Sequence, residues 1–162
     1  MEKIIIFEYI VYIFLKEYSL ITWLSEKDVM NWTNDLSILK IQKLLFFLST
    51  KSKKILNIFE FYALPYWPVD IDTYTNYSKL KYFEISTKNT ILKDSFELDN
   101  ENLKSFVNEA INSLKSENSS IFKLGAFDLV NITHKWSCWK DNKTFRWLIT
   151  RDEILSSISY YK

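Results

Sequence analysis

The sequence predicts a mainly α-helical fold of the α+β class, in which a compact helical domain carries one small antiparallel β-hairpin. Apolar residues recur at steps of three and four along several segments, glycine occurs once in 162 residues, and one short segment alternates apolar with polar residues. A chain of this length buries one adequate hydrophobic core. We therefore expect one globular unit, with an N-terminal helical segment (1–35) packed on a domain of residues 36–162.

The first segment has the spacing of a mostly buried helix. Its apolar stripe is formed by Ile4, Phe7, Val11, Phe14 and Tyr18. Charged residues at positions 8, 16 and 17 interrupt it, and the longest uncharged run is far shorter than the roughly 20 residues that cross a bilayer. No membrane span is expected.

Two further helices follow in the next thirty or so residues. Ser25 and Asp28 resemble a weak capping box, which opens a short helix that ends near Trp32. Asn34 or Asp35 then caps a helix over 36–48, whose broad apolar face marks it as the central core helix. This pattern places Lys40 and Lys43 toward solvent.

The middle of the chain breaks this periodicity. Two prolines in the segment 65–77 indicate a structured loop that enters a short helix. Asp70 and Asp72 are spaced like calcium ligands, but the glycine and glutamate of a calcium loop do not follow, so a cation site is disfavoured. Alternation on both sides of 87–89 predicts the hairpin.

The C-terminal part returns to helical patterns. Asp99 is expected to cap a helix that runs to about Ser116, and Ser119 or Ser120 begins another segment. Phe127, with Val130 or Leu129, is expected to face the core. Thr150 and Glu153 form a capping box for a terminal helix that reaches about Tyr160.

The strongest site candidate is the segment 133–140, which holds the only histidine, the only cysteine and two of the six tryptophans. On one helix, His134 as a general base could face Cys138 as a nucleophile, but the sequence shows no orienting group or oxyanion hole. A metal site would need distant ligands. We therefore favour a structural His134 that caps a helix end or hydrogen-bonds beneath Trp139, with no catalytic residue, metal or cofactor.

Charge leaves several partner classes open. The 21 basic and 20 acidic groups nearly cancel, so no long-range field attracts nucleic acid. Locally, cations mix with tryptophans, and this mix suits single-stranded nucleic acid, an acidic protein partner or a solvated loop. The residues are Lys135, Lys140, Lys143 and Arg146 with Trp136, Trp139 and Trp147. A single cysteine forms no internal disulfide, which favours a cytoplasmic location.

Three segments in order resemble the hallmarks of the Panacea domain, also called the SocA-like antitoxin domain. The first is the helix at 36–48, which contains Gln42 and Lys43 of a Lys-Leu-Gln-Lys-Leu-Leu-Tyr pattern. The second joins the aromatic and alanine pair that ends at Ala63 to Pro68 and the following valine. The third is 128–140, where Thr133 and His134 precede a tryptophan. The resemblance covers about 36–160, and it departs from the family at Trp67, where a glycine is usual.

This resemblance implies an antitoxin that neutralises a cognate toxin protein by direct binding, without catalysis and with nucleic acid an unlikely partner. The alternative is a phage or mobile-element protein of the same fold that acts as a binding module or adaptor. The residues expected at the partner surface are His134, Trp136, Trp139, Lys140, Arg146, Tyr66 and Trp67. The residues expected to mark the fold are Gln42, Lys43, Ala63, Pro68, Thr133 and His134.

Overall fold

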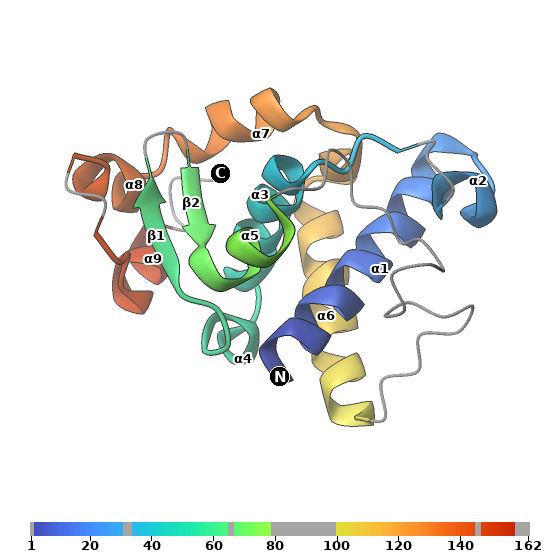
Figure 1. The fold of residues 1–162 in the computed structure, drawn as a ribbon, viewed down its shortest axis with the longest axis horizontal. Coiled ribbons are helices and arrows are strands. Elements are labelled where there is room, and N and C mark those ends of the chain that lie inside the picture. The colour runs from blue at the N-terminus through green and yellow to red at the C-terminus, as the bar shows by residue number, and fades with distance from the viewer. Residues whose placement is uncertain (1, 31–33, 65–66, 79–99, 145–146, 158–162) are drawn as a thin grey trace.

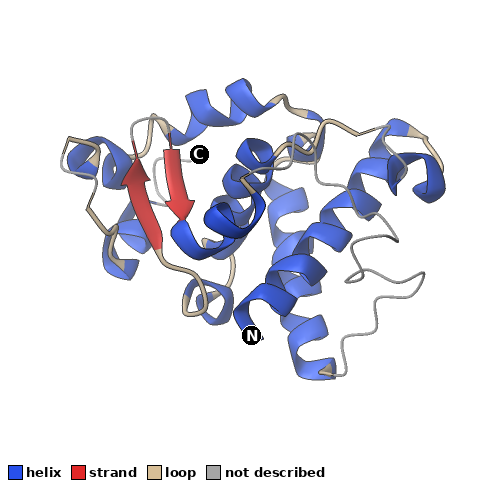
Figure 2. Cartoon of the chain, in the orientation of Figure 1, coloured by secondary structure: helices blue, strands red, loops and turns tan. Residues whose placement is uncertain are grey.

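The computed structural model describes residues 2–30, 34–64, 67–78, 100–144 and 147–157. Within these ranges helices predominate, and the one sheet has two antiparallel strands (Figures 1 and 2). The predicted fold class is confirmed. In the same ranges, no helix is both long enough and apolar enough to cross a membrane.

The N-terminal segment forms α1 (Glu2–Thr22) and α2 (Glu26–Met30). The middle of the apolar stripe of α1 is buried at Phe7, Val11 and Phe14, and the Phe14 ring lies 5.6 Å from the ring of Phe122. The predicted cap is confirmed, because Ser25 Oγ accepts the Asp28 N–H at 3.1 Å. Between the two helices, Trp23 has a φ of 61°, the one positive value at a non-glycine position in the described ranges.

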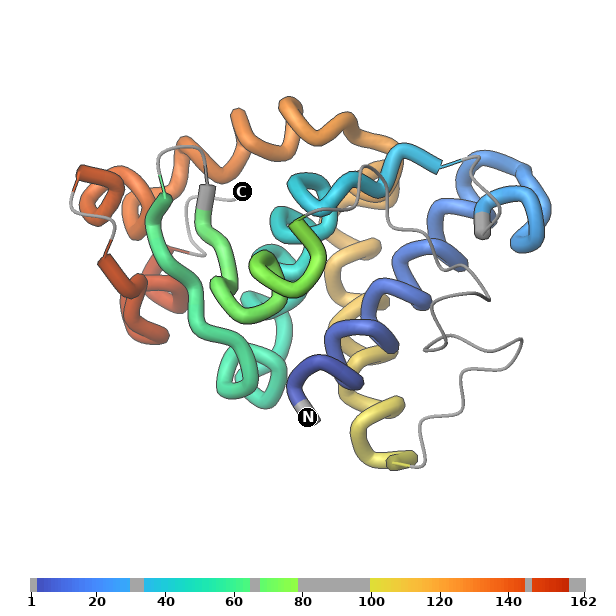
Figure 3. Tube along the Cα trace, viewed as in Figure 1, coloured from blue at the N-terminus to red at the C-terminus, as the bar shows by residue number. Residues whose placement is uncertain are grey.

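The central helix is α3 (Ile38–Ser49), which contacts α4, α5, α6, α7 and β2 (Figure 3). The expected cap at Asn34 or Asp35 is wrong. Ser37 caps the helix, and its Oγ accepts the Lys40 N–H at 3.3 Å. The Asn34 side chain instead accepts the Leu36 N–H.

The expected solvent exposure of Lys40 and Lys43 is also wrong, because both side chains are fully buried. Neighbouring elements cover α3 on several sides, so its polar stripe is enclosed together with its apolar one. The Lys40 ammonium lies 2.6 Å from the Asp35 carboxylate and 5.2 Å from the Tyr18 ring centre. Burial lowers the pKa of Lys40 and, more strongly, that of Lys43.

The second strand of the hairpin lies in the segment 65–77, which its prolines indicated as a loop. After the short helix α4 (Lys53–Leu56), β1 (Phe61–Leu64) pairs with β2 (Trp67–Asp70), with Ala63 opposite Pro68. The short helix α5 (Ile71–Tyr77) follows as expected. The predicted hairpin around 87–89 lies outside the described residues.

β1 pairs with β2 at one edge and with residues 147–149 at the other, and this arrangement explains why Pro68 fits in a strand. Phe61 and Ala63 form backbone hydrogen bonds with Ile149 and Trp147, at 2.7 and 3.0 Å. Backbone groups alternate between the two edges of a strand, so Tyr62 is the residue of β1 that exchanges hydrogen bonds with β2. The nitrogen of Pro68 therefore faces away from β1, and no ladder hydrogen bond is lost. Because Trp67 begins a strand without a positive φ, a tryptophan at this position carries no left-handed strain.

The long helix α6 (Glu101–Glu117) is capped by Asn100, whose side chain accepts the Leu103 N–H at 3.1 Å. The expected cap, Asp99, lies outside the described residues. The short helix η2 (Ile121–Lys123) then contributes Phe122 to the core.

The last helices are α7 (Ala126–Thr133), α8 (Ser137–Asn142) and α9 (Arg151–Ser157). Leu129 and Val130 are buried as expected, but Phe127 is 76% exposed, so its expected core position is wrong. Phe127 lies in the first turn of α7, where its side chain faces solvent. The Thr150 capping box is confirmed, with the Thr150 N–H 2.7 Å from Glu153 Oε2 and the Glu153 N–H 3.3 Å from Thr150 Oγ1.

Candidate functional site

His134 is the C-terminal cap of α7, so its expected position at a helix end is confirmed. Its N–H donates to the Val130 carbonyl at 2.9 Å. The imidazole stacks on the Trp139 indole, with ring centres 3.8 Å apart and planes at 15°. The Lys143 ammonium lies 5.0 Å from the same indole. His134 is therefore part of an aromatic stack that joins α7 to α8.

The two tryptophans of this segment are packed inside the protein. Trp136 is 1% exposed, and its ring meets Phe46 edge-on at 5.3 Å. Trp139 is 5% exposed, and its indole Nε1 donates to the Leu64 carbonyl at 3.2 Å. In this conformation neither ring offers a partner much contact area, although both were expected at the partner surface.

Cys138 is buried in α8 and separated from His134 by the turn between the helices. Its backbone N–H donates to Ser157 Oγ at 3.2 Å. Burial raises the pKa of the thiol to about 11, so little of the nucleophilic thiolate exists near neutral pH. Since α7 ends before His134 and α8 begins after it, the pair does not share one helix face. The sequence cluster is thus a junction between helices rather than a nucleophile and base pair.

The other expected partner residues are distributed as follows. Lys140 is exposed on α8. The backbone of Trp67 belongs to β2, and its side chain lies outside the described set, as do Tyr66 and Arg146. Trp147 is 60% exposed and Leu148 is 42% exposed, which makes this stretch the apolar surface next to the tryptophan junction.

The family resemblance predicts that Gln42 is a signature residue of the fold. The structure shows which elements its side chain connects. Its side-chain oxygen accepts the Asp70 N–H at 3.0 Å, and its side-chain nitrogen donates to Thr73 Oγ1 at 2.8 Å. All three residues are fully buried. Gln42 therefore fixes α3 to the end of β2 and the start of α5.

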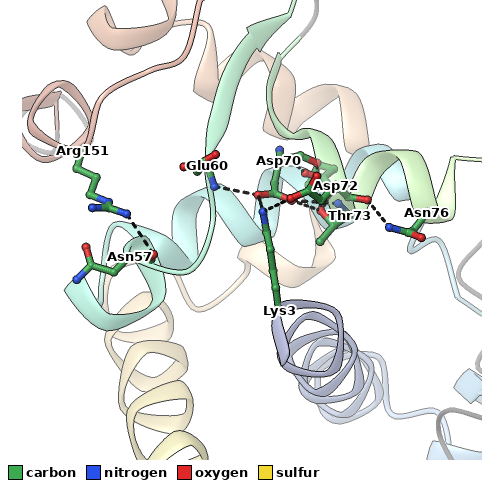
Figure 4. A network of polar contacts seen from close by, with 9 residues as sticks. Lys3, Asn57, Glu60, Asp70, Asp72, Thr73, Asn76 and Arg151 are labelled. Carbon is green, nitrogen blue, oxygen red and sulfur yellow. Dashed lines mark hydrogen bonds and ion pairs between the residues drawn. The ribbon is translucent and has the colours of Figure 1, made fainter. Parts of the chain in front are cut away.

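Asp70 is the centre of a buried polar network that sequence reasoning missed (Figure 4). It caps α5, because Oδ1 accepts the Thr73 N–H at 3.0 Å. Its Oδ2 accepts the Glu60 N–H at 2.9 Å and lies 2.6 Å from the Lys3 ammonium. The sequence contained one sign of this network, an aspartate three residues before Thr73 that could cap a helix. Nothing in the sequence indicated that Lys3, at the start of α1, would pair with it.

Lys3 also pairs with the carboxylate of Asp72 at 2.8 Å, so one ammonium contacts both aspartates of the calcium-like spacing. Burial lowers the pKa of Lys3, but the hydrogen bonds to Asp70 and Asp72 outweigh it, and the net pKa is raised. Across the described ranges, no group of three or more acidic, histidine or cysteine side chains is arranged to hold a metal ion.

The three segments that carry the family resemblance therefore meet in space. Gln42 binds the end of β2, Trp139 binds the end of β1, and Trp136 packs on α3. Comparison of the chain with protein-family models, with curated proteins and with solved structures finds no match.

Proposed function

We propose that this chain is an antitoxin, which neutralises a toxin protein by binding it in a stoichiometric complex. The observation that carries the proposal is the division of aromatic residues in the C-terminal part of the chain. Trp136 and Trp139 are buried in the core, whereas Trp147 is 60% exposed. Exposed tryptophans are frequent anchors of protein interfaces, since they provide a large contact area at low entropic cost.

The chemistry of the reactive residues supports a role in binding. The His134 ring is committed to the Trp139 stack, and the Cys138 thiol is buried with a raised pKa of about 11. The ordered resemblance to the Panacea domain supports the antitoxin class in particular. The segments that resemble its motifs are held in place by a buried contact of Gln42 and a half-buried contact of Trp139, and this supports the proposal.

The test begins with the gene next to the one that encodes this chain. Expressed alone, its product is expected to arrest growth, and co-expression with this chain should restore growth and allow the two proteins to be purified together. A harmless neighbour that does not co-purify would overturn the antitoxin proposal. A harmless neighbour that does co-purify would instead favour the binding-module or adaptor alternative.

A surface variant can then locate the contact. Trp147→Ala should weaken the complex by at least tenfold, because hot-spot tryptophans often contribute about 2 kcal/mol or more. Trp23→Ala is the matched control, since Trp23 is 93% exposed and lies in the connection between α1 and α2. Equal loss in both variants would argue against an interface at Trp147.

A further inference from the structure

A surface pocket of about 440 Å³ lies where the end of α4, the start of β1 and the start of α9 meet. Its floor is apolar and is formed by the buried residues Leu56, Phe59, Ile149 and Ile154. Leu148, which is 42% exposed, lines it as well, next to exposed Trp147. The volume is large enough for an apolar side chain of another molecule.

The rim of this pocket has an excess of negative charge. Glu60 and Asp152 line it with exposed carboxylates, and neither pairs with a cation in the described part of the chain. The rim also holds Arg151, whose guanidinium donates to the Asn57 carbonyl at 3.2 Å and keeps its positive charge, so the carboxylates outnumber the cation at the rim by two to one (Figure 4). The backbone N–H of Glu60 binds Asp70, which leaves its side chain directed outward.

Leu148 adds a backbone donor and acceptor. Trp147 and Ile149 use their backbone groups to bind β1, so the N–H and C=O of Leu148 face the opposite way. No described residue hydrogen-bonds to either group. Leu148 forms an isolated bridge with Tyr62, and its outward N–H and C=O can pair with an extended peptide.

We propose that this pocket receives an extended segment of the protein partner, in which a large apolar side chain lies beside a lysine or arginine. The apolar side chain fills the floor, the cation lies near Glu60 and Asp152, and the segment's backbone pairs with Leu148. Charge complementarity favours this occupant, because two carboxylates against one guanidinium leave an excess of negative charge at the rim, which attracts a cationic segment more than an acidic segment or a nucleic acid backbone. The inference rests on the proposed function, since it assumes a protein partner.

Defined peptides test the pocket without the natural partner. The probes are a synthetic peptide that alternates leucine with lysine and a matched peptide with glutamate in place of lysine. In methyl NMR spectra of the full chain, the lysine peptide should shift the signals of Ile149 and Ile154, and the glutamate peptide should not. Equal shifts with both peptides, or shifts with neither, would overturn the proposal.

Charge reversal gives the second arm of the test. Glu60→Lys should weaken binding of the lysine peptide by at least tenfold and leave the circular dichroism spectrum unchanged, because its side chain is exposed. Glu26→Lys is the control, an exposed acidic residue in the first turn of α2. The same loss in the control would mean general charge attraction and would contradict a specific pocket.

The co-purified neighbour distinguishes the two proposals. If it binds the wild-type chain and the variants Glu60→Lys and Leu148→Ser equally well, the pocket assignment fails while the antitoxin proposal stands. If the peptides behave as expected but the neighbour neither arrests growth nor binds, the antitoxin proposal fails and the pocket is supported as the site for another protein.

Discussion

The indole of Trp139 donates a hydrogen bond to the backbone carbonyl of Leu64, 75 positions earlier in the chain. This contact fixes α8 to the end of β1, on the side where residues 147–149 pair with the strand. The opposite end of the hairpin is held by Gln42 and Lys3 through Asp70. The hairpin is therefore anchored at both ends by polar contacts from three separate helices.

Trp139→Phe is expected to lower the free energy of unfolding by about 1–2 kcal/mol, because the half-buried Leu64 carbonyl loses its donor while most of the ring packing remains. Urea titration followed by circular dichroism measures the change. Trp147→Phe is the control, and its effect should stay within about 0.5 kcal/mol because that side chain is 60% exposed. Equal effects would show that the Trp139 hydrogen bond contributes nothing.

Asp70→Ala is expected to destabilise the protein by about 3–5 kcal/mol, since it leaves the Thr73 and Glu60 N–H groups without their acceptor and removes the buried one of the two carboxylates that pair with Lys3. Asp70→Asn should cost less, because its side-chain oxygen still accepts a hydrogen bond. Asp72→Asn is the control at the exposed end of the same network, with an expected cost of about 0–1 kcal/mol. Similar costs at positions 70 and 72 would refute the central role of Asp70.

Cys138 is expected to react slowly with thiol reagents in the folded protein. With a pKa of about 11, its thiolate fraction at pH 8 is smaller than that of an ordinary cysteine by a factor of roughly a hundred or more. The rate should rise as pH increases toward that value. Colour release from Ellman's reagent, with and without urea, measures it, and rapid reaction in the native state would contradict the burial of this thiol.

Glu8 is expected to make the protein less stable as pH rises from mild acid. Burial raises the pKa of its carboxyl above the usual 4.5, against a smaller opposing effect of the hydrogen bond from Tyr77. The folded state thus holds a proton that the unfolded chain has released, and stability falls between the unfolded and folded pKa values. Glu8→Gln cannot ionise and should remove this slope from urea titrations made at several pH values. Exposed Glu26→Gln should retain it.

Helices could be predicted from the sequence because apolar spacing and capping residues are local signals. The Thr150 and Glu153 cap and the stripe of α1 were both evident in this way. Burial of Lys40 and Lys43 could not be predicted, because it depends on elements from distant parts of the chain that surround α3. The strand that contains Pro68 was not predicted for the same reason. A proline fits in this strand because residues 147–149 bind Phe61 and Ala63 at the other edge of β1, and that contact comes from a distant part of the chain.

The candidate site was predicted in part. His134 at a helix end was one of the two structural roles expected, because the sequence shows no catalytic partners for it. The burial of Trp136 against Phe46 required the path of the whole chain, and so did the ion pair of Lys3 with Asp70. The single histidine, the single cysteine and the two tryptophans identified the segment 133–140 from the sequence. The presence of these residue types did not show whether they pack in the core or take part in a reaction.

The contact of Phe14 with Phe122 also constrains how the protein forms during translation. The buried stripe of α1 leaves the ribosome about a hundred residues before η2 does, a delay of at least several seconds at roughly 5–20 residues per second. During that interval a strongly apolar helix has no η2 to cover it. The newly made chain should therefore depend on chaperones that shield nascent apolar segments, and depletion of such chaperones should reduce its yield more than that of a protein with local contacts.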